Sequence, residues 1–323
     1  MRAIVYASYG TPEVLEVREV PTPSPTEHEL LIRVRATTVS SADWRARSLS
    51  MPRGFGVFGR LAFGIRGPRQ PILGVELAGE VERVGDRVTS FRPGDQVFAF
   101  PGASLGCHAE YRCVRADGPV ALMPARWSFA QAAALSFGGA TMLDFYRKAA
   151  LARGERVLVN GSSGTVGSAA VQLAKHFGAH VTAVCSTANV ALVNAIGADE
   201  VIDYSLDDFA RSPARYDVIV DTAGTAPFAR CGHLLNRGGR LIVVLGDLRA
   251  LLHAPFAGRL QGKKVIAGPA AERPEYVHEL RAIAEAGGFT PVVDRSYSFE
   301  EAREAHAFVD QGRKRGSVVL TLR

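Results

Sequence analysis

The chain has 323 residues, of which 47% are hydrophobic and 22% charged, and its formal net charge is +6. This composition excludes a disordered chain, a collagen and a coiled coil, and the length favours two domains. No apolar run reaches the roughly 18 residues that a membrane-spanning helix needs, and the first residues turn polar too early for a signal peptide. We therefore expect no membrane partner. The Lys and Arg residues are scattered, which favours a solvated basic surface and no nucleic-acid partner.

The first 116 residues are typical of short β-strands. Apolar and polar positions alternate around Leu30, Ile32 and Val34, and again in 74–84, 96–100 and 109–114. Proline and glycine separate these runs, so we predict a β-barrel or a sandwich. A loop rich in glycine and phenylalanine, Ser48 to Gln70, interrupts the pattern. It is either a lid at the rim of a site or a surface insertion.

From about residue 120 the pattern changes to strands that alternate with helices. Six short apolar runs predict strands, at 157–159, 181–184, 201–202, 218–220, 241–245 and 265–267. Strands joined by helical crossovers favour a doubly wound parallel sheet. After about 270 we expect a helix, a strand near 291–293, a helix over 299–309 and a last strand over 318–322.

A glycine-rich turn is the strongest chemical signal in the sequence. Gly161, Gly164 and Gly167 follow an apolar strand and open a helix with a buried stripe. Glycine permits close approach of the backbone, and a helix N-terminus offers free N–H groups to a pyrophosphate. We therefore predict dinucleotide binding by Gly161, Ser162, Gly164, Thr165, Val166 and Gly167, in preference to a plain tight turn.

The end of the next strand indicates which nicotinamide cofactor would bind. A binding site for NAD usually has an acidic residue there, for the ribose 2′-hydroxyl. Here the strand ends at Cys185, and Ser186, Thr187 and Asn189 can donate hydrogen bonds to a 2′-phosphate. This favours NADPH, although no Arg or Lys stands nearby as a further phosphate ligand.

The four cysteines, Cys107, Cys113, Cys185 and Cys231, have no Cys-x-x-Cys spacing. Cys107, His108 and Cys113 are either the start of a metal cluster or incidental residues beside a strand, and we favour the second interpretation. So few cysteines are typical of a reducing compartment, and we expect a cytoplasmic protein.

Residues 74–88 and 92–97 resemble the signature of the medium-chain dehydrogenase/reductase superfamily, except that Val75 stands where the signature has a histidine. The resemblance places the family's catalytic zinc ligands at Ser40, Val75 and 136–137, which are poor zinc ligands. The chain therefore resembles the zinc-free quinone oxidoreductase branch, and we expect no metal. This implies an α/β fold with a Rossmann domain over 120–269 and a discontinuous β-rich GroES-like barrel domain over 1–119 and 270–323.

The resemblance also implies roles for single residues. Tyr204 would lie near the adenosine phosphate, Ala223 and Leu245 would face the cofactor from strand ends, and Thr141 would lie beneath the nicotinamide. Arg315 matches a basic position at the cleft, and Ser40, Asp43 and Trp44 would lie on the substrate side. For each of these residues a structural role remains the alternative: a surface aromatic for Tyr204, a helix hydroxyl for Thr141, a solvated charge for Arg315, a loop contact for Asp43 and core packing for Trp44.

The leading hypothesis is a zinc-independent, NADPH-dependent reductase that delivers hydride to a small hydrophobic quinone or an activated enone, with a proton from water. One alternative is an NADPH-dependent enoyl-thioester reductase, which would need a proton donor such as a tyrosine near 40–44, where none stands. The other is a non-catalytic, NADPH-binding interaction protein. The family resemblance implies a homodimer, through an edge strand at 241–245 or 265–267.

Overall fold

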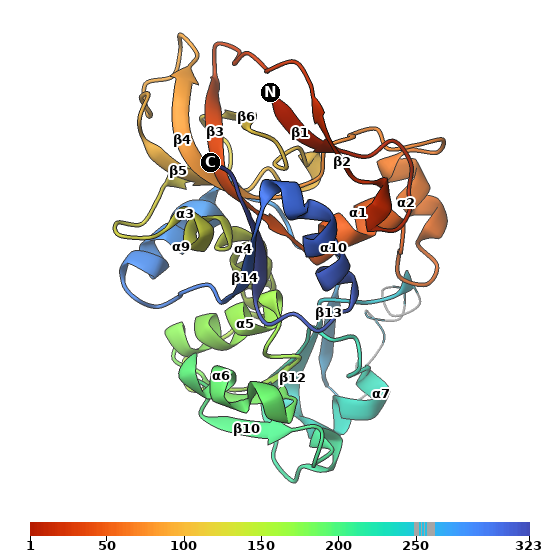
Figure 1. Ribbon diagram of the computed structural model, residues 1–323. Coiled ribbons are helices and arrows are strands. Elements are labelled where there is room, and N and C mark those ends of the chain that lie inside the picture. Colours follow the sequence, from red (N-terminus) through yellow and green to blue (C-terminus); the bar gives the residue numbers. More distant parts are fainter. Residues whose placement is uncertain (249–251, 253, 255, 257–261) are drawn as a thin grey trace.

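The computed structural model describes residues 1–248, 252, 254, 256 and 262–323. Two sheets dominate it, one in the upper and one in the lower half of Figure 1, and both chain termini lie in the upper half. None of the described helices is long and apolar enough to cross a membrane. The largest hydrophobic core joins the two halves, since Val34 and Phe98 of the upper sheet belong to the same buried cluster as Val157 and Val181 of the lower one.

The upper sheet contains seven strands in the order β14-β15-β3-β4-β5-β7, with β6 paired to β3. Neighbouring strands are antiparallel except β14 and β15, which run parallel. The strands are β3 (Glu29–Val39), β4 (Leu77–Val84), β5 (Gln96–Ala99), β6 (Tyr111–Arg115), β7 (Val120–Leu122), β14 (Val293–Ser298) and β15 (Ser317–Thr321). A separate hairpin pairs β1 (Arg2–Val5) with β2 (Glu16–Glu19). The last two strands of the chain thus complete a sheet that its first third begins.

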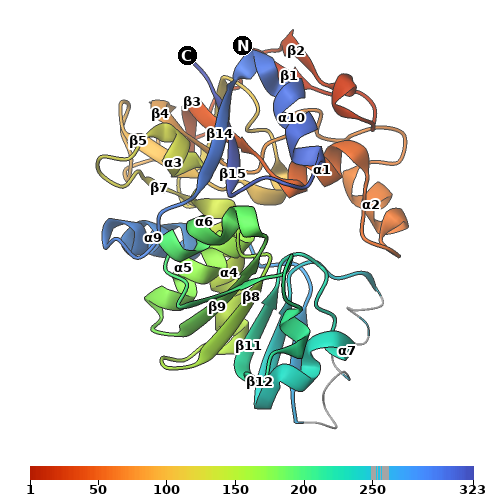
Figure 2. The ribbon, with the colours of Figure 1, turned by 60° about the horizontal axis from the view of Figure 1, so that its bottom comes forward.

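The lower sheet is parallel throughout, with the strand order β10-β9-β8-β11-β12-β13. Its strands are β8 (Arg156–Asn160), β9 (His180–Cys185), β10 (Glu200–Asp203), β11 (Tyr216–Asp221), β12 (Leu235–Val243) and β13 (Lys264–Ala267). This order reverses direction at β8, as in a dinucleotide-binding fold. Figure 2 shows these strands side by side, with helices packed against them. The expected α/β fold, with a Rossmann sheet beside a GroES-like one, is confirmed.

Nine described helices connect or cover the sheets. They are α1 (Ser41–Ser48), α2 (Gly56–Phe63), α3 (Phe129–Ala133), α4 (Ser136–Ala149), α5 (Thr165–His176), α6 (Val190–Ala195), α7 (Phe228–Cys231), α9 (Pro274–Glu285) and α10 (Ala302–Asp310). Helix α4 lies close to the start of α5, because a Cβ atom on Gly138 would stand only 2.6 Å from the carbonyl oxygen of Thr165. The small residues around 138–140 thus bring α4 against the glycine-rich turn.

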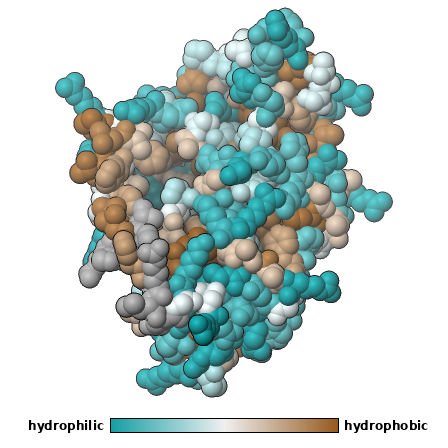
Figure 3. Space-filling view, turned by 180° about the vertical axis from the view of Figure 1, so that it is seen from behind, coloured by the Kyte–Doolittle hydropathy of each residue, from teal (hydrophilic) through white to brown (hydrophobic). Residues whose placement is uncertain are grey.

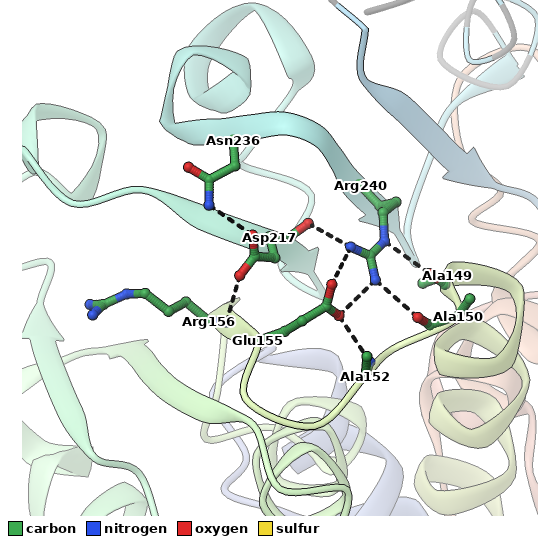
Figure 4. A network of polar contacts seen from close by, with 8 residues as sticks. All are labelled: Ala149, Ala150, Ala152, Glu155, Arg156, Asp217, Asn236 and Arg240. Atoms are coloured by element: carbon green, nitrogen blue, oxygen red, sulfur yellow. Dashed lines mark hydrogen bonds and ion pairs between the residues drawn. The ribbon is translucent and has the colours of Figure 1, made fainter.

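An ion-pair network supports the edge of the lower sheet that faces away from the carboxyl ends of its strands (Figure 4). The Arg240 guanidinium donates to both carboxylate oxygens of Glu155 at 2.7 Å and to the carbonyl of Ala149 at the end of α4. Asp217 accepts from the backbone N–H of Arg156 and the amide of Asn236. Charged bidentate bonds are strong and directional, so this network fixes α4 against the start of β8 and β12.

Three sequence-based expectations differ from the structure. Strand β7, Val120–Leu122, pairs with β5, so the upper sheet extends three residues beyond the domain boundary that we expected at 119. Residues 241–243 lie in β12, which is paired on both sides, so this run cannot form the edge strand of a homodimer. Within the described residues, the outer strands of the lower sheet are β10 and β13. The loop expected at 48–70 contains the helix α2.

Candidate functional site

A cleft of about 800 Å³ lies where the carboxyl ends of β8, β9, β11 and β12 face the upper half of the molecule. Ligands of doubly wound sheets bind at this edge, beside the point where the strand order reverses. Of the residues predicted for the site, ten line the cleft: Trp44, Thr141, Gly161, Gly164, Thr165, Val166, Gly167, Tyr204, Ala223 and Leu245.

The glycine-rich turn forms the floor of this cleft. Gly161 has a φ of +81°, which favours glycine, and a Cβ on Gly167 would stand 2.0 Å from the carbonyl oxygen of Gly161. At Gly164 a Cβ would meet only that carbonyl, at 3.8 Å. The turn is therefore tightly packed behind Gly161 and Gly167 but open on the side of Gly164. Gly164 is the N-cap of α5, so the first N–H groups of the helix, which have no partner within it, lie next to this open side. This cradle fits a cofactor diphosphate.

Ser162 does not line the cleft. Its side chain is fully buried, and its hydroxyl donates to the carbonyl oxygen of Val184 at 2.9 Å. It thus holds the turn against β9, which supports the cradle without touching a ligand.

A buried carboxylate positions the loop after β11. Asp221 is 1% exposed, and its oxygens accept from four successive backbone N–H groups, those of residues 223–226. The amide of Asn160, at the end of β8, also donates to Asp221 at 2.9 Å. Together they place Thr222 and Ala223 at the cleft, beside Gly161. The sequence analysis missed Asn160 and Asp221, although a polar residue at the end of each of two buried strands was a usable signal.

Lys314, rather than the predicted Arg315, reaches the cleft. Its ammonium group donates to the hydroxyl of Thr165 and, at 2.7 Å, to the carbonyl of Gly316. Burial lowers the pKa of Lys314 to about 8, although the carboxylates of Glu76 and Asp294 act in the opposite direction. Arg315 is exposed and is not among the residues that line the cleft.

The same segment joins the two halves of the molecule at the cradle. The N–H of Gly316 donates to the carbonyl of Ser163 at 2.8 Å, and the Thr165 hydroxyl donates to the carbonyl of Gly316 at 2.7 Å. The chain from Lys314 to Gly316 is thus bonded directly to the turn. A cation lies beside the start of α5, where the diphosphate of a dinucleotide would bind.

Ser40 and Asp43 are buried and do not line the cleft. The Ser40 hydroxyl accepts from N–H groups at the start of α1, and the Asp43 carboxylate accepts from the N–H of Ser40 at 2.8 Å, which is a capping box. The Ser40 hydroxyl also donates to Asp43 at 2.6 Å. The other oxygen of Asp43 accepts from the N–H of Gly74 at 2.7 Å. The structure thus gives these two residues a supporting role, the alternative that we stated for Asp43, and no direct contact with the site.

Glu76 is a third buried carboxylate behind the cleft. One oxygen accepts from the Thr38 hydroxyl at 2.6 Å, and the other accepts from the N–H groups of Ser136 and Phe137 at the start of α4. Burial raises the pKa of Glu76 to about 7, although these three hydrogen bonds act in the opposite direction. Glu76 thus ties β4 to the helix that presents Phe137 and Thr141 to the cleft.

Aromatic side chains form one wall of the cleft: Trp44, Phe55, Phe100, Phe137 and Phe145. The hydroxyl of Thr141 donates back to the carbonyl of Phe137 at 2.6 Å, so its hydrogen is engaged within its own helix. This wall offers flat, apolar surface to a ligand.

The opposite end of the cleft contains Cys185 and the exposed Tyr204. Ser186, Thr187 and Asn189 lie just beyond β9 but do not line the cleft. The Asn189 amide donates to the hydroxyls of Ser186 and Ser163. A hydrogen bond from Thr187 holds the pKa of Asp203 below its ordinary value, so this carboxylate, which the sequence analysis did not consider, is charged beside the loop.

None of the residues at the family's zinc-ligand positions is a Cys, a His or a carboxylate. Val75 is apolar, Ser40 binds Asp43, and the side chain of Ser136 is buried without a partner among the described residues. Throughout the described part of the chain, no three His, Cys, Asp or Glu side chains gather in a way that could hold a metal ion. The ring of His108 lies against the carbonyl of Thr38 at 3.0 Å, and Cys113 is half-buried on β6.

Two known families match the chain. Residues 26–125 match the family described as alcohol dehydrogenase GroES-like domain, and residues 196–320 match the family described as zinc-binding dehydrogenase. The chain is 32% identical to a chloroplastic quinone oxidoreductase, QR1, of Triphysaria versicolor over 99% of this chain and 98% of that protein. It is 31% identical to a 2-methylene-furan-3-one reductase of Solanum lycopersicum, over 99% of this chain and 79% of that one.

Among solved structures, the quinone oxidoreductase from Coxiella burnetii resembles the chain with a TM-score of 0.86 and 26% identity, over 100% of this chain and 99% of that one. The cleft of this chain combines a backbone cradle at the start of α5 with aromatic side chains. The comparisons imply a nicotinamide cofactor and an oxidoreductase activity. The chain belongs to the medium-chain dehydrogenase/reductase superfamily, in its quinone oxidoreductase-like branch.

Proposed function

We propose that the chain is a zinc-independent reductase that uses NADPH to reduce a small hydrophobic quinone or a conjugated enone. The observation that carries this proposal is the composition of the cleft: a diphosphate cradle at Gly164 and Thr165 faces a wall of aromatic side chains across one space. Two relatives named above are a quinone oxidoreductase and a furanone reductase, which supports this substrate class.

Different residues of the cleft would have different roles in such a reaction. The N–H groups at the start of α5 and the ammonium of Lys314 would hold the cofactor diphosphate. Ala223 and Leu245, at the ends of β11 and β12, would orient the nicotinamide end, and Thr141 would lie beneath it. Trp44 and Phe137 would pack on a flat substrate and exclude water. When bound, NADPH supplies the hydride, and water supplies the proton.

Zinc independence is supported by the chemistry of the residues at the expected ligand positions. A catalytic zinc needs about three protein ligands of the Cys, His or carboxylate kind. Val75 has no donor atom, and the Ser40 hydroxyl is directed to Asp43. A quinone or enone spreads the arriving negative charge over its conjugated system, so its reduction does not require a Lewis acid. We expect activity to survive extensive treatment with a chelator, and loss of activity with recovery on adding zinc would contradict this proposal.

The preference for NADPH is supported by Ser186, Thr187 and Asn189, which supply polar groups beyond β9, a strand without an acidic residue at its end. The measurement is kcat/KM for NADPH and for NADH with one quinone. A higher value for NADH would overturn the assignment of the cofactor but not that of the reaction.

The test of the reaction is oxidation of NADPH, followed by its absorbance, with ortho- and para-quinones, with enones and with an enoyl thioester. We expect turnover with the quinones or enones. Turnover of the thioester alone would favour an enoyl-thioester reductase. Tight binding of NADPH without turnover of any compound would favour a non-catalytic, cofactor-binding protein.

We further propose that the chain forms a homodimer in a reducing compartment such as the cytoplasm. Strand β13 is an outer strand of the lower sheet in the described part of the chain, and a second copy would cover it. All four cysteines are free thiols, which agrees with such a compartment. Light scattering would test the dimer, and a monomer at all concentrations would contradict it.

A further inference from the structure

The positive charge of the chain is concentrated in one segment. Residues 44–75 contain six arginines and no Asp, Glu or Lys, whereas the other 32 Lys and Arg residues are balanced by the 32 acidic residues of the chain. The whole formal excess of +6 thus resides in this segment. This differs from the scattered distribution that we inferred from the sequence.

Four of the six arginines are exposed at the surface, and one of these, Arg60, donates to the carbonyl oxygen of Ile65 at 3.3 Å. Arg47 is fully buried and forms an ion pair with Asp310, and Arg45 packs over Trp44. The other four are exposed, and no carboxylate of the described residues lies within ion-pair distance of them: Arg53, Arg60, Arg66 and Arg69. Their charge is therefore available to an external partner.

Large apolar side chains are exposed in the same segment. Val57, Phe58 and Leu61 of α2 are 71%, 56% and 51% exposed, and Ile65 just beyond the helix is 61% exposed. Val57 and Leu61 are four residues apart, so they lie on the same side of the helix. The side of the molecule that carries α2 has a broad apolar area in Figure 3. Contiguous exposed apolar surface of this kind marks an interaction site.

This surface continues into the mouth of the cleft. Met51, Pro52 and Phe55, at the start of the same segment, line the cleft. The rings of Phe55 and Phe58 are in edge contact, with their centres 6.2 Å apart. One aromatic side chain thus faces the cleft while its neighbour faces outward.

We propose that the α2 face, which comprises Val57, Phe58, Leu61 and Ile65 with Arg53, Arg60, Arg66 and Arg69, docks on the surface of an anionic lipid bilayer. Apolar side chains of an interfacial helix enter the boundary between head groups and acyl chains, and flanking arginines bind the anionic head groups. The earlier expectation of no membrane partner concerned spanning helices and signal peptides, and it did not consider such a surface.

The charge and the apolar side chains of the α2 face together favour a bilayer over a second copy of the chain or a nucleic acid. A second copy of the chain seated on the same face would bring four unpaired arginines against four more, which disfavours that interface. A nucleic acid would satisfy the arginines but would leave the aliphatic side chains of Val57, Leu61 and Ile65 in water. An anionic bilayer satisfies both sets at once.

Docking would place the mouth of the cleft at the lipid surface, past Met51 and Phe55. A quinone dissolved in the bilayer could then enter without crossing water. This consequence alone rests on the proposed function, whereas the docking itself does not.

The experiment is sedimentation of the full chain with two kinds of vesicle, phosphatidylcholine alone and an equal mixture with phosphatidylglycerol. We expect binding to the mixed vesicles that weakens as salt is added. Since each arginine near an anionic surface contributes about 1 kcal/mol, each Arg→Gln change at 53, 60, 66 or 69 should weaken binding about fivefold, and all four together several hundredfold. The double variant Phe58→Ser and Leu61→Ser should bind the mixed vesicles roughly tenfold more weakly, or weaker still.

The matched controls are Leu206→Ser, at a residue that is 79% exposed elsewhere, and Arg211→Gln, at an exposed arginine. Both should bind as the parent chain does. The proposal is overturned if the mixed vesicles do not bind, if the α2 variants bind as well as the controls, or if the α2 variants instead dissociate a homodimer. It is also overturned if heparin binds with the same dependence on the arginines while Phe58→Ser and Leu61→Ser leave vesicle binding unchanged. Turnover of a water-soluble quinone, measured on the same variants, tests the proposed function separately, because none of these residues lines the cleft.

Discussion

Replacement of Glu76 by glutamine should change how the stability of the protein depends on pH. Glu76 is 1% exposed and accepts three hydrogen bonds, and burial raises its pKa from the ordinary 4.5 to about 7. The folded state therefore binds a proton more tightly than the unfolded chain between these pH values. Since stability falls with rising pH wherever the native state holds more protons, Glu76 makes the fold less stable as the pH rises from about 4.5 to 7.

The size of the effect follows from the shift. One pKa unit corresponds to about 1.4 kcal/mol, so an increase of the pKa from 4.5 to about 7 costs the fold about 3 kcal/mol at pH 8. A glutamine can accept from the N–H groups of Ser136 and Phe137 and donate to Thr38, but the Thr38 hydroxyl then loses its acceptor, at about 1 kcal/mol. We expect Glu76→Gln to stabilise the protein by about 2 kcal/mol at pH 8 and to destabilise it by about 1 kcal/mol near pH 4.5.

The assay is urea unfolding of both proteins by circular dichroism over this pH range. The difference between the two proteins must be compared, because the buried His306 acts in the opposite direction. Burial lowers the pKa of His306 well below its ordinary value, so its contribution to stability grows as the pH rises and hides part of the slope due to Glu76. A difference that does not vary with pH would refute the assignment of a buried, proton-binding role to Glu76.

Three further predictions test the site. Lys314→Met should weaken binding of the cofactor roughly tenfold to a hundredfold. We expect the Kd of the parent chain to rise above about pH 8, where Lys314 loses its proton, and the variant to lack this rise. A variant with the same pH profile as the parent chain would exclude Lys314 as the ligand. Gly167→Ala should abolish cofactor binding and lower the midpoint of thermal unfolding, because the new Cβ would stand 2.0 Å from the carbonyl oxygen of Gly161. Gly164→Ala should weaken cofactor binding with little change of that midpoint. Asp203→Asn should raise kcat/KM for NADPH relative to NADH severalfold, because it removes a carboxylate near the 2′-phosphate. Asp207→Asn is the control. An equal ratio of the two kcat/KM values in both variants would place Asp203 away from the cofactor.

Much of the fold was predictable from local patterns in the sequence. The six apolar runs between 157 and 267 correspond to β8 to β13, and the spacing of Gly161, Gly164 and Gly167 indicated the cradle at the start of α5. Both signals depend on periodicity and backbone geometry over a few residues, which a sequence shows directly. The presence of Val75, where the family signature has a histidine, was likewise visible without a structure.

Which side chains face the cleft was not predictable in the same way. Ser40 and Asp43 match family positions, but their hydrogen bonds with each other and with Gly74 direct both side chains into the protein interior. In the run 313–315, the sequence offered three basic residues, and only the bonds of Gly316 to Ser163 and Thr165 aim Lys314 at the cradle and leave Arg315 in solvent. These contacts join positions about 150 residues apart, so no local pattern encodes them.

The sequence by itself therefore determined three features of this protein: two β-rich parts, a cofactor turn and a position without its zinc ligand. Only the tertiary structure decided which of their side chains are buried and which are exposed. Of the six arginines in 44–75, Arg47 is buried against Asp310 while four remain in solvent beside exposed apolar side chains. The physical reason is that local sequence sets backbone conformation, whereas burial and charge pairing depend on which distant segments pack together.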